Sequence, residues 1–186
     1  AVIGESGDSW LSQRDHALFL LMYNTGARVS EIIGVKVGDV VLDASSACVH
    51  LHGKGRKQRS VPLWRSTVKA LRAWLHVNPQ FDGTSPLLPN RSGHEMTRAN
   101  VTLRLASAVL RATETQPALA KRKVSPHTIR HTTAMHLLQS GVDISVIALW
   151  LGHESPVTTH HYVEADLAMK ERALARLHEP AAKIQR

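Results

Sequence analysis

The chain has 186 residues, of which 23 are Lys or Arg and 15 are Asp or Glu, giving a net charge of +8, while 43% are hydrophobic. This composition excludes whole-chain disorder and indicates a folded domain with a basic face. No apolar run reaches the roughly 18 residues that a membrane helix needs. The single Cys48 leaves no partner for an internal disulfide, so we expect a cytoplasmic protein without a membrane anchor.

Helices are predicted at the start of the chain. Ser12 followed by Asp15 resembles a capping box, and the apolar face that follows stops at the Asn-Thr-Gly turn of residues 24–26. A second helix is expected from about Arg28. Alternating residues at 48–52 and the stretch 60–63 then predict a small antiparallel hairpin across a Gly-rich link.

The rest of the chain reads as helical. Helical spacing of apolar residues, Pro at a first turn and Gly at chain reversals support these elements. The expected helices cover 66–77, 97–113, 126–140, 143–152, a stretch from 155, and 165–177. The predicted fold class is mostly α with a small antiparallel β-sheet (α+β), in a single domain over residues 1–186.

Positive charge is concentrated around the hairpin. Between Asp43 and Asp82 there is no acidic residue but there are seven Lys or Arg. Cations that neutralise phosphates release condensed counterions, so nucleic acid is the favoured partner, with a merely solvated surface as the alternative. Because the chain has few aromatic residues for stacking, duplex DNA is favoured over a single strand. The candidate DNA-binding residues are Arg56, Lys57, Arg59, Lys121, Arg122 and Lys123.

Five short motifs carry polar residues that a hydrophobic core does not need. They are Thr25 to Glu31, Gly53 to Gly55, His127 to His131, Leu151 to His153, and Tyr162. His127 and Arg130 are three residues apart, so they share one helix face, as two groups that grip one anion would. Arg forks and His donors suit the charged oxygens of a phosphodiester when no metal is present.

A metal site fits these residues poorly. His127 and His131 have the i, i+4 spacing of a zinc face, but Arg130 beside them would repel a cation. No acidic cluster, H-E-x-x-H motif or Cys pair accompanies them. We therefore predict no metal and no other cofactor.

In this order and at these intervals the motifs resemble the catalytic domain of the tyrosine recombinases, the phage integrase family. The resemblance covers about residues 11–164. It implies the tyrosine recombinase catalytic-domain fold and a site-specific recombinase or integrase, which cleaves and rejoins duplex DNA without metal through a 3′-phosphotyrosine intermediate.

The resemblance also implies a role for each motif residue. The implied catalytic residues are Arg28, Lys54, His127, Arg130, His153 and Tyr162. The two Arg would clamp the scissile phosphate and the two His would complete its cradle. Tyr162 would be the nucleophile and Lys54 the general acid that protonates the departing 5′-oxygen.

Physical chemistry is consistent with these roles. A phenol with a pKa near about 10 is a poor nucleophile at neutral pH until a cationic site stabilises its oxyanion. Lys suits proton donation better than Arg, which does not release a proton in proteins. Glu31 would support the Arg28 guanidinium, and His131 would be a supporting or packing group. Trp150 is expected to be a core anchor.

Partners follow from the resemblance too. It implies a homo-tetramer on two DNA sites for a full-length protein, with a monomer as the alternative for this sequence alone. It also implies a further N-terminal domain outside this sequence and action at the nucleoid of a bacterial or phage-type system. The C-terminal helix and tail, residues 165–186, would be exchanged between protomers or packed on their own domain. Two alternatives stay open: DNA relaxation like that of a type IB topoisomerase, and a basic DNA-binding module without catalysis.

Overall fold

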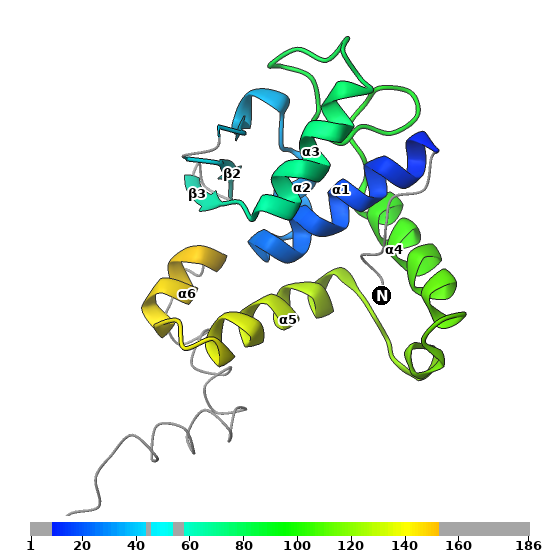
Figure 1. Cartoon of the computed structure of the whole chain (residues 1–186), viewed down its shortest axis with the longest axis vertical. Coiled ribbons are helices and arrows are strands. Elements are labelled where there is room, and N and C mark those ends of the chain that lie inside the picture. The colour runs from blue at the N-terminus through cyan, green and yellow to red at the C-terminus, as the bar shows by residue number, and fades with distance from the viewer. Residues whose placement is uncertain (1–8, 44–45, 54–57, 153–186) are drawn as a thin grey trace, which may run out of the picture.

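The computed structural model describes residues 9–43, 46–53 and 58–152, which form a set of helices with one small sheet at one side (Figure 1). This confirms the predicted fold class. In chain order the elements are α1 (Trp10–Thr25), α2 (Val29–Ile33), the 3₁₀ turn η1 (Val37–Asp39), β1 (Val40–Val41), β2 (Cys48–His52), β3 (Gln58–Pro62), α3 (Arg65–His76), α4 (Arg98–Thr113), the 3₁₀ turn η3 (Pro117–Lys121), α5 (Pro126–Gln139) and α6 (Ile144–Leu151).

The start of α1 differs from the prediction. Its cap is Ser9, whose hydroxyl accepts a hydrogen bond from the backbone N–H of Ser12 at 3.2 Å. Asp15 is buried, and its carboxylate pairs with Arg14 at 2.7 Å and with Arg104 at 2.6 Å. The predicted capping box is therefore wrong, because ion pairs with the adjacent Arg14 and the distant Arg104, and not local capping, fix the Asp15 side chain.

The end of α1 is the one predicted. Gly26 adopts the left-handed conformation with φ of 58°, and its N–H donates to the carbonyl of Met22 at 2.9 Å. A glycine in this conformation closes a helix without the steric cost of a side chain. The turn reverses the chain toward α2 and leaves the carbonyl of Gly26 to accept a hydrogen bond from Arg130.

We expect Gly26→Ala to destabilise the fold by roughly 2 to 4 kcal/mol, from a left-handed alanine and from overpacking. The added Cβ would lie 2.5 Å from Cδ2 of the buried Leu151. Urea unfolding measures the loss. Gly141→Ala is the matched control, because Gly141 has a φ of +82° but nothing within 4 Å of an added Cβ. Equal losses in the two variants would show that contact with Leu151 contributes nothing.

The sheet has the strand order β1-β2-β3 and is antiparallel throughout. The partner strand was predicted at 60–63 but occupies Gln58–Pro62, because ladder pairing continues to the end of β2. Val61 pairs with Val49, and Arg59 pairs with Leu51. Since side chains two apart share a face, Arg59 lies on the same face as the buried Val61.

The helices after the sheet match their predicted ranges to within two residues. Thr97, Ser125 and Asp143 cap α4, α5 and α6, because each side chain accepts a hydrogen bond from a backbone N–H of the first turn. The predicted helices from 155 and over 165–177 lie outside the described residues. None of the helices in 9–43, 46–53 and 58–152 is both long and apolar enough for a bilayer crossing.

The core has two parts. The larger one joins α1, α3, α4 and the sheet, with Trp74 at its centre, and the smaller one joins α5 to α6 through Ala134, Leu138, Ile147 and Leu151. Trp150 is half-buried against both, as expected of a core anchor. These clusters hold the ends of α1, α5 and α6 together.

Asn24 fastens the same region through polar contacts. Its side-chain amide donates to the carbonyl of Pro62 at 3.0 Å and accepts from the backbone N–H of Trp64 at 2.8 Å. Its own carbonyl accepts from the Trp150 indole at 3.2 Å. The end of α1 is thereby tied to the link after β3 and to α6.

Candidate active site

Three guanidinium groups converge on the last carbonyls of α6. Each donates to one of three consecutive residues: Arg59 to Trp150 (2.9 Å), Arg130 to Leu151 (2.9 Å) and Arg28 to Gly152 (3.5 Å). The last carbonyls of a helix have no partner within it and carry partial negative charge, so cations are favoured there. This arginine cluster therefore surrounds the chain immediately before His153.

Arg130 projects from α5 into the centre of the cluster, and only 6% of it is exposed. Besides Leu151 it donates to the carbonyl of Gly26 at 2.6 Å. A planar guanidinium held by two carbonyls from different elements has a fixed orientation. Arg130 thus joins the turn after α1 to the end of α6.

Arg28 precedes the first residue of α2 and has a half-exposed side chain. Its backbone N–H donates to Oε2 of Glu31 at 2.7 Å, while its guanidinium lies 3.6 Å from Oε1. Glu31 therefore holds the main chain of Arg28 more closely than its guanidinium. The predicted support for Arg28 is present, but it acts chiefly through the backbone.

Glu31 makes its strongest contact with Arg59. Nη1 and Nη2 of Arg59 donate to the two carboxylate oxygens at 2.6 Å and 3.0 Å, and the side chains are 14% and 3% exposed. Together with Trp150, this pair engages all three guanidinium nitrogens. Arg59 is therefore not a free surface cation, because a buried carboxylate already pairs with it, and its contact with DNA phosphates stays a prediction.

The same contacts set the ionisation of Glu31. Burial by itself raises the pKa of this carboxyl, but the hydrogen bond from Arg59, the N–H of Arg28 and the two positive charges outweigh it. The net effect is a pKa below the ordinary value of 4.5. Glu31 is therefore a carboxylate at neutral pH and can hold both arginines.

We expect Glu31→Gln to lower the free energy of unfolding by about 3 kcal/mol at pH 7, because it leaves the largely buried guanidinium of Arg59 without its carboxylate partner. A lowered folded pKa contributes stability that is present above 4.5 and is lost as the pH falls through the folded value. The gap between wild type and variant in urea titrations should therefore shrink as the pH falls below about 4.5 and through the lowered folded pKa of the carboxyl. The exposed Glu95→Gln is the control, and a gap that is constant with pH would contradict the assignment.

Two of the three predicted histidines, His127 and His131, lie on α5. His127 is in its first turn and exposed, one turn before Arg130, and His131 follows Arg130 and is also exposed. Lys121, Arg122 and Lys123 are exposed between α4 and α5. The predicted residues that lie outside the described ranges are Lys54, Arg56, Lys57, His153 and Tyr162.

The sequence was also compared with known protein families. The sequence pattern described as the Phage integrase family matches residues 3–169. The chain belongs to this family. The resemblance seen in the motifs is thereby confirmed for nearly the whole chain.

Relatives in the phage integrase family are similar to this chain over part of their length. The integrase/recombinase y4rC of Sinorhizobium fredii is 43% identical over 178 residues, covering 96% of this chain and 53% of the relative. Tyrosine recombinase XerC of Neisseria meningitidis serogroup C is 41% identical over 181 residues, covering 97% of this chain and 56% of the relative. The chain spans just over half the length of these relatives.

Solved tyrosine recombinases share the fold. The XerA recombinase has a TM-score of 0.73 at 25% identity, over 90% of this chain and 58% of that one. A second structure is the XerH site-specific recombinase bound to palindromic difH substrate in a post-cleavage complex. It has a TM-score of 0.76 at 24% identity, over 92% of this chain and 48% of that one. The predicted tyrosine recombinase catalytic-domain fold is confirmed.

Arg59 is the residue of this phage integrase domain whose place the sequence reasoning missed. The predicted strand begins at residue 60, which leaves Arg59 outside it, and Arg59 is counted among the candidate DNA-binding residues. Extending the strand by one residue puts Arg59 on the face of Val61, and that alternation was the available signal. A half-buried Arg needs a carboxylate, and Glu31 supplies it.

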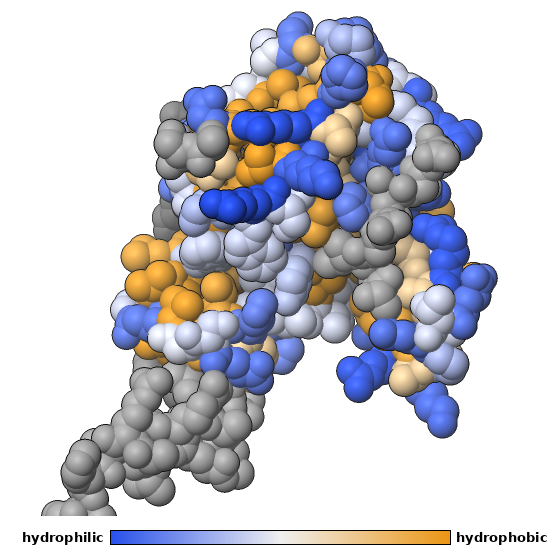
Figure 2. Space-filling view, in the orientation of Figure 1, coloured by the Kyte–Doolittle hydropathy of each residue, from blue (hydrophilic) through white to orange (hydrophobic). Residues whose placement is uncertain are grey.

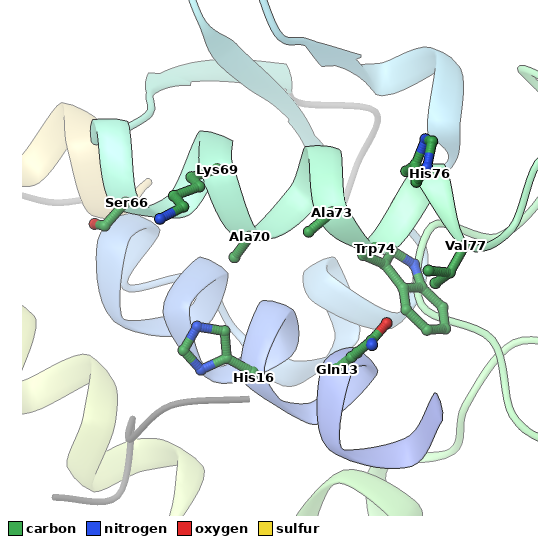
Figure 3. A pocket seen from close by; sticks show the side chains of 9 residues that line it. All are labelled: Gln13, His16, Ser66, Lys69, Ala70, Ala73, Trp74, His76 and Val77. Atoms are coloured by element: carbon green, nitrogen blue, oxygen red, sulfur yellow. The ribbon is translucent and has the colours of Figure 1, made fainter. Parts of the chain in front are cut away.

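A groove elsewhere on the phage integrase domain does not belong to the arginine cluster. It has a volume of about 560 Å³ and runs between α1 and α3, with Gln13 and His16 facing Lys69, Ala70 and other α3 side chains (Figure 3). Nδ1 of His16 is buried there without a hydrogen-bond partner. None of the predicted site residues lines this groove.

Metal ligands do not gather in the part of the domain that the structure describes. Within 9–43, 46–53 and 58–152, no three His, Cys, Asp or Glu side chains form a group that could hold a metal ion. The charges at the arginine cluster come from guanidinium groups and one carboxylate.

Proposed function

We propose that this chain is the catalytic domain of a site-specific DNA recombinase or integrase. It cleaves and rejoins duplex DNA without metal, through a 3′-phosphotyrosine intermediate on Tyr162. The observation that carries the proposal is the arginine cluster on the α6 carbonyls, which ends at Gly152. In the sequence His153 follows directly, and Tyr162 comes ten residues after Gly152. Cations oriented in advance stabilise the charge that develops on a phosphoryl group in transfer.

The chemistry balances without a cofactor. The phenolate oxygen of Tyr162 attacks phosphorus and forms the Tyr–O–P bond, while the bond from phosphorus to the 5′-oxygen breaks. The phenolic proton leaves to a base, and Lys54 gives its proton to the departing 5′-oxygen. Attack by a 5′-hydroxyl on the phosphotyrosine reverses the step, so the phosphodiester energy is kept.

The described residues support particular roles. The half-exposed guanidinium of Arg28 is accessible to a phosphate, and Arg130 has a fixed orientation at the same helix end. His127 and His153 complete the phosphate cradle in this proposal, with His131 as a supporting group. DNA backbone contacts come from Arg56, Lys57, Lys121, Arg122 and Lys123.

DNA is the proposed partner, and a homo-tetramer on two sites the proposed assembly. XerH is described as bound to its difH substrate, and a λ integrase dimer as bound to a COC′ core site. An apolar face on α6, formed by Val146 (46% exposed) and Leu149 (75% exposed), supports contact with another copy. Figure 2 shows hydrophobic atoms gathered over this helix. Exchange of residues 165–186 between protomers and action on nucleoid DNA in the cytoplasm belong to the same proposal.

A nicked suicide duplex tests the function. Cleavage near a nick releases a short strand that diffuses away, so the covalent protein–DNA adduct accumulates and migrates slowly in a denaturing gel. The expected result is an adduct that forms in EDTA. Binding without any adduct would indicate a basic DNA-binding module, and plasmid relaxation at high dilution without exchanged products would indicate a topoisomerase.

A further inference from the structure

Arg59 connects three parts of the site that are distant in sequence. It lies on β3, pairs with Glu31 of α2 through two nitrogens, and donates through the third to the carbonyl of Trp150 on α6. We propose that Arg59 is a positioning residue that sets the spacing between Arg28 and Arg130, and that it acts without touching DNA. The inference rests on the proposed recombinase function.

The contact with α6 is close. The end of α6 passes over the guanidinium at Gly152, where a Cβ would lie 2.7 Å from Nη1 and 3.0 Å from Cζ of Arg59. Gly152 has a φ of 66°, so its left-handed turn and its missing side chain both fit the position. The guanidinium is therefore in van der Waals contact with the backbone that leads to His153.

Arg59 reaches both phosphate-clamping arginines through one intermediate each. On one side Glu31 Oε2 accepts from Arg59 and also from the backbone N–H of Arg28. On the other side the carbonyl of Trp150 that Arg59 holds is followed by the carbonyl of Leu151 that Arg130 holds. Movement of Arg59 would thus shift Arg28 and Arg130 relative to each other.

Only an arginine satisfies this geometry. Its fork matches the two carboxylate oxygens, and Nε points away from the fork toward the Trp150 carbonyl. Lys keeps the charge but offers a single nitrogen, so it can hold Glu31 or the α6 carbonyl but not both in this arrangement. Arg59→Lys therefore separates charge from position.

The experiment compares intact recombinase with Arg59→Lys and Arg59→Gln. At saturating suicide substrate we expect both variants to lose about 10²-fold in the first-order cleavage rate, the cost of misplacing reacting groups by about 1 Å. A plot of the logarithm of DNA affinity against the logarithm of salt concentration should keep the wild-type slope in both variants. A slope lower by about one with an unchanged saturated rate would show a phosphate contact and overturn the proposal.

Arg104→Lys is the matched control. Arg104 also pairs with a buried carboxylate, that of Asp15, but at the α1–α4 contact away from the arginine cluster. The Arg104→Lys variant should have a lower melting temperature but should cleave at the wild-type rate at temperatures below its unfolding transition. An equal rate loss in Arg104→Lys, or a wild-type rate in Arg59→Lys, would overturn the positioning role.

A double-mutant cycle with Glu31→Gln completes the test. Because Arg59 and Glu31 act as one unit, the double variant should cleave no more slowly than the slower single variant. Rate losses that multiply would mean that the two residues act independently, which contradicts the proposal. A wild-type protein that forms no adduct would instead refute the recombinase function, so the two failures are distinct.

Discussion

Tyr162→Phe should abolish the covalent protein–DNA adduct while leaving DNA binding intact. The substitution removes one oxygen, the atom that forms the bond to phosphorus, and keeps the ring. No other group of the proposed site can form an aryl phosphate, so we expect no adduct above the background of a reaction without protein. Adduct formation on the suicide duplex measures the loss, and a gel-shift titration measures binding.

The chain offers a matched control for this experiment, because it has only two tyrosines. Tyr23 lies on α1, and its hydroxyl is 2.9 Å from Nδ1 of His136. Tyr23→Phe loses this hydrogen bond but should form the adduct at the wild-type rate. An adduct that persists in Tyr162→Phe, or disappears in Tyr23→Phe, would show that the nucleophile has been assigned to the wrong residue.

Arg130 should be the described side chain whose loss slows cleavage most. Its guanidinium is buried and holds the carbonyls of Gly26 and Leu151 at 2.6 Å and 2.9 Å. Removing one fixed donor from a charge-stabilising site costs about 10² to 10³ in rate. We expect Arg130→Lys to lose about 10³-fold or more, because it also disturbs the end of α6.

Folding must be separated from catalysis for this variant. The free energy of unfolding and the DNA affinity of Arg130→Lys should be measured beside its single-turnover cleavage rate. Arg111→Lys, on the exposed side of the last turn of α4, is the control and should match the wild type in all three. A folded, DNA-binding Arg130→Lys protein that cleaves at the wild-type rate would exclude Arg130 from the phosphate clamp.

The arginine cluster shows how one helix end can organise the proposed catalytic site. The carbonyls of the last turn of α6 orient three guanidinium groups, and the buried Glu31 orients two of them further. The groups therefore keep their directions before any phosphate arrives. This is the preorganisation that electrostatic catalysis requires, and it follows from backbone geometry as much as from side chains.

The sequence by itself determined the elements and the family. Helix caps such as Thr97 and Ser125, and the stop at Gly26, depend on hydrogen bonds within four residues, so they can be read locally. The five motifs in order were enough to predict the phage integrase family, which the match over residues 3–169 confirms. The catalytic roles of all six site residues stay predictions, and three of these residues, Lys54, His153 and Tyr162, lie outside the described ranges.

Only the tertiary structure decided which charges pair. Arg59 and Glu31 are 28 residues apart, and Arg130 and Gly26 are 104 apart, so no local pattern joins them. The prediction for Asp15 was wrong for a related reason, since one of its two partners, Arg104, is 89 residues away. Such pairs form because packing of β3, α1 and α6 removes water around a charge, and a buried charge must then take the nearest opposite charge or carbonyl that the fold supplies.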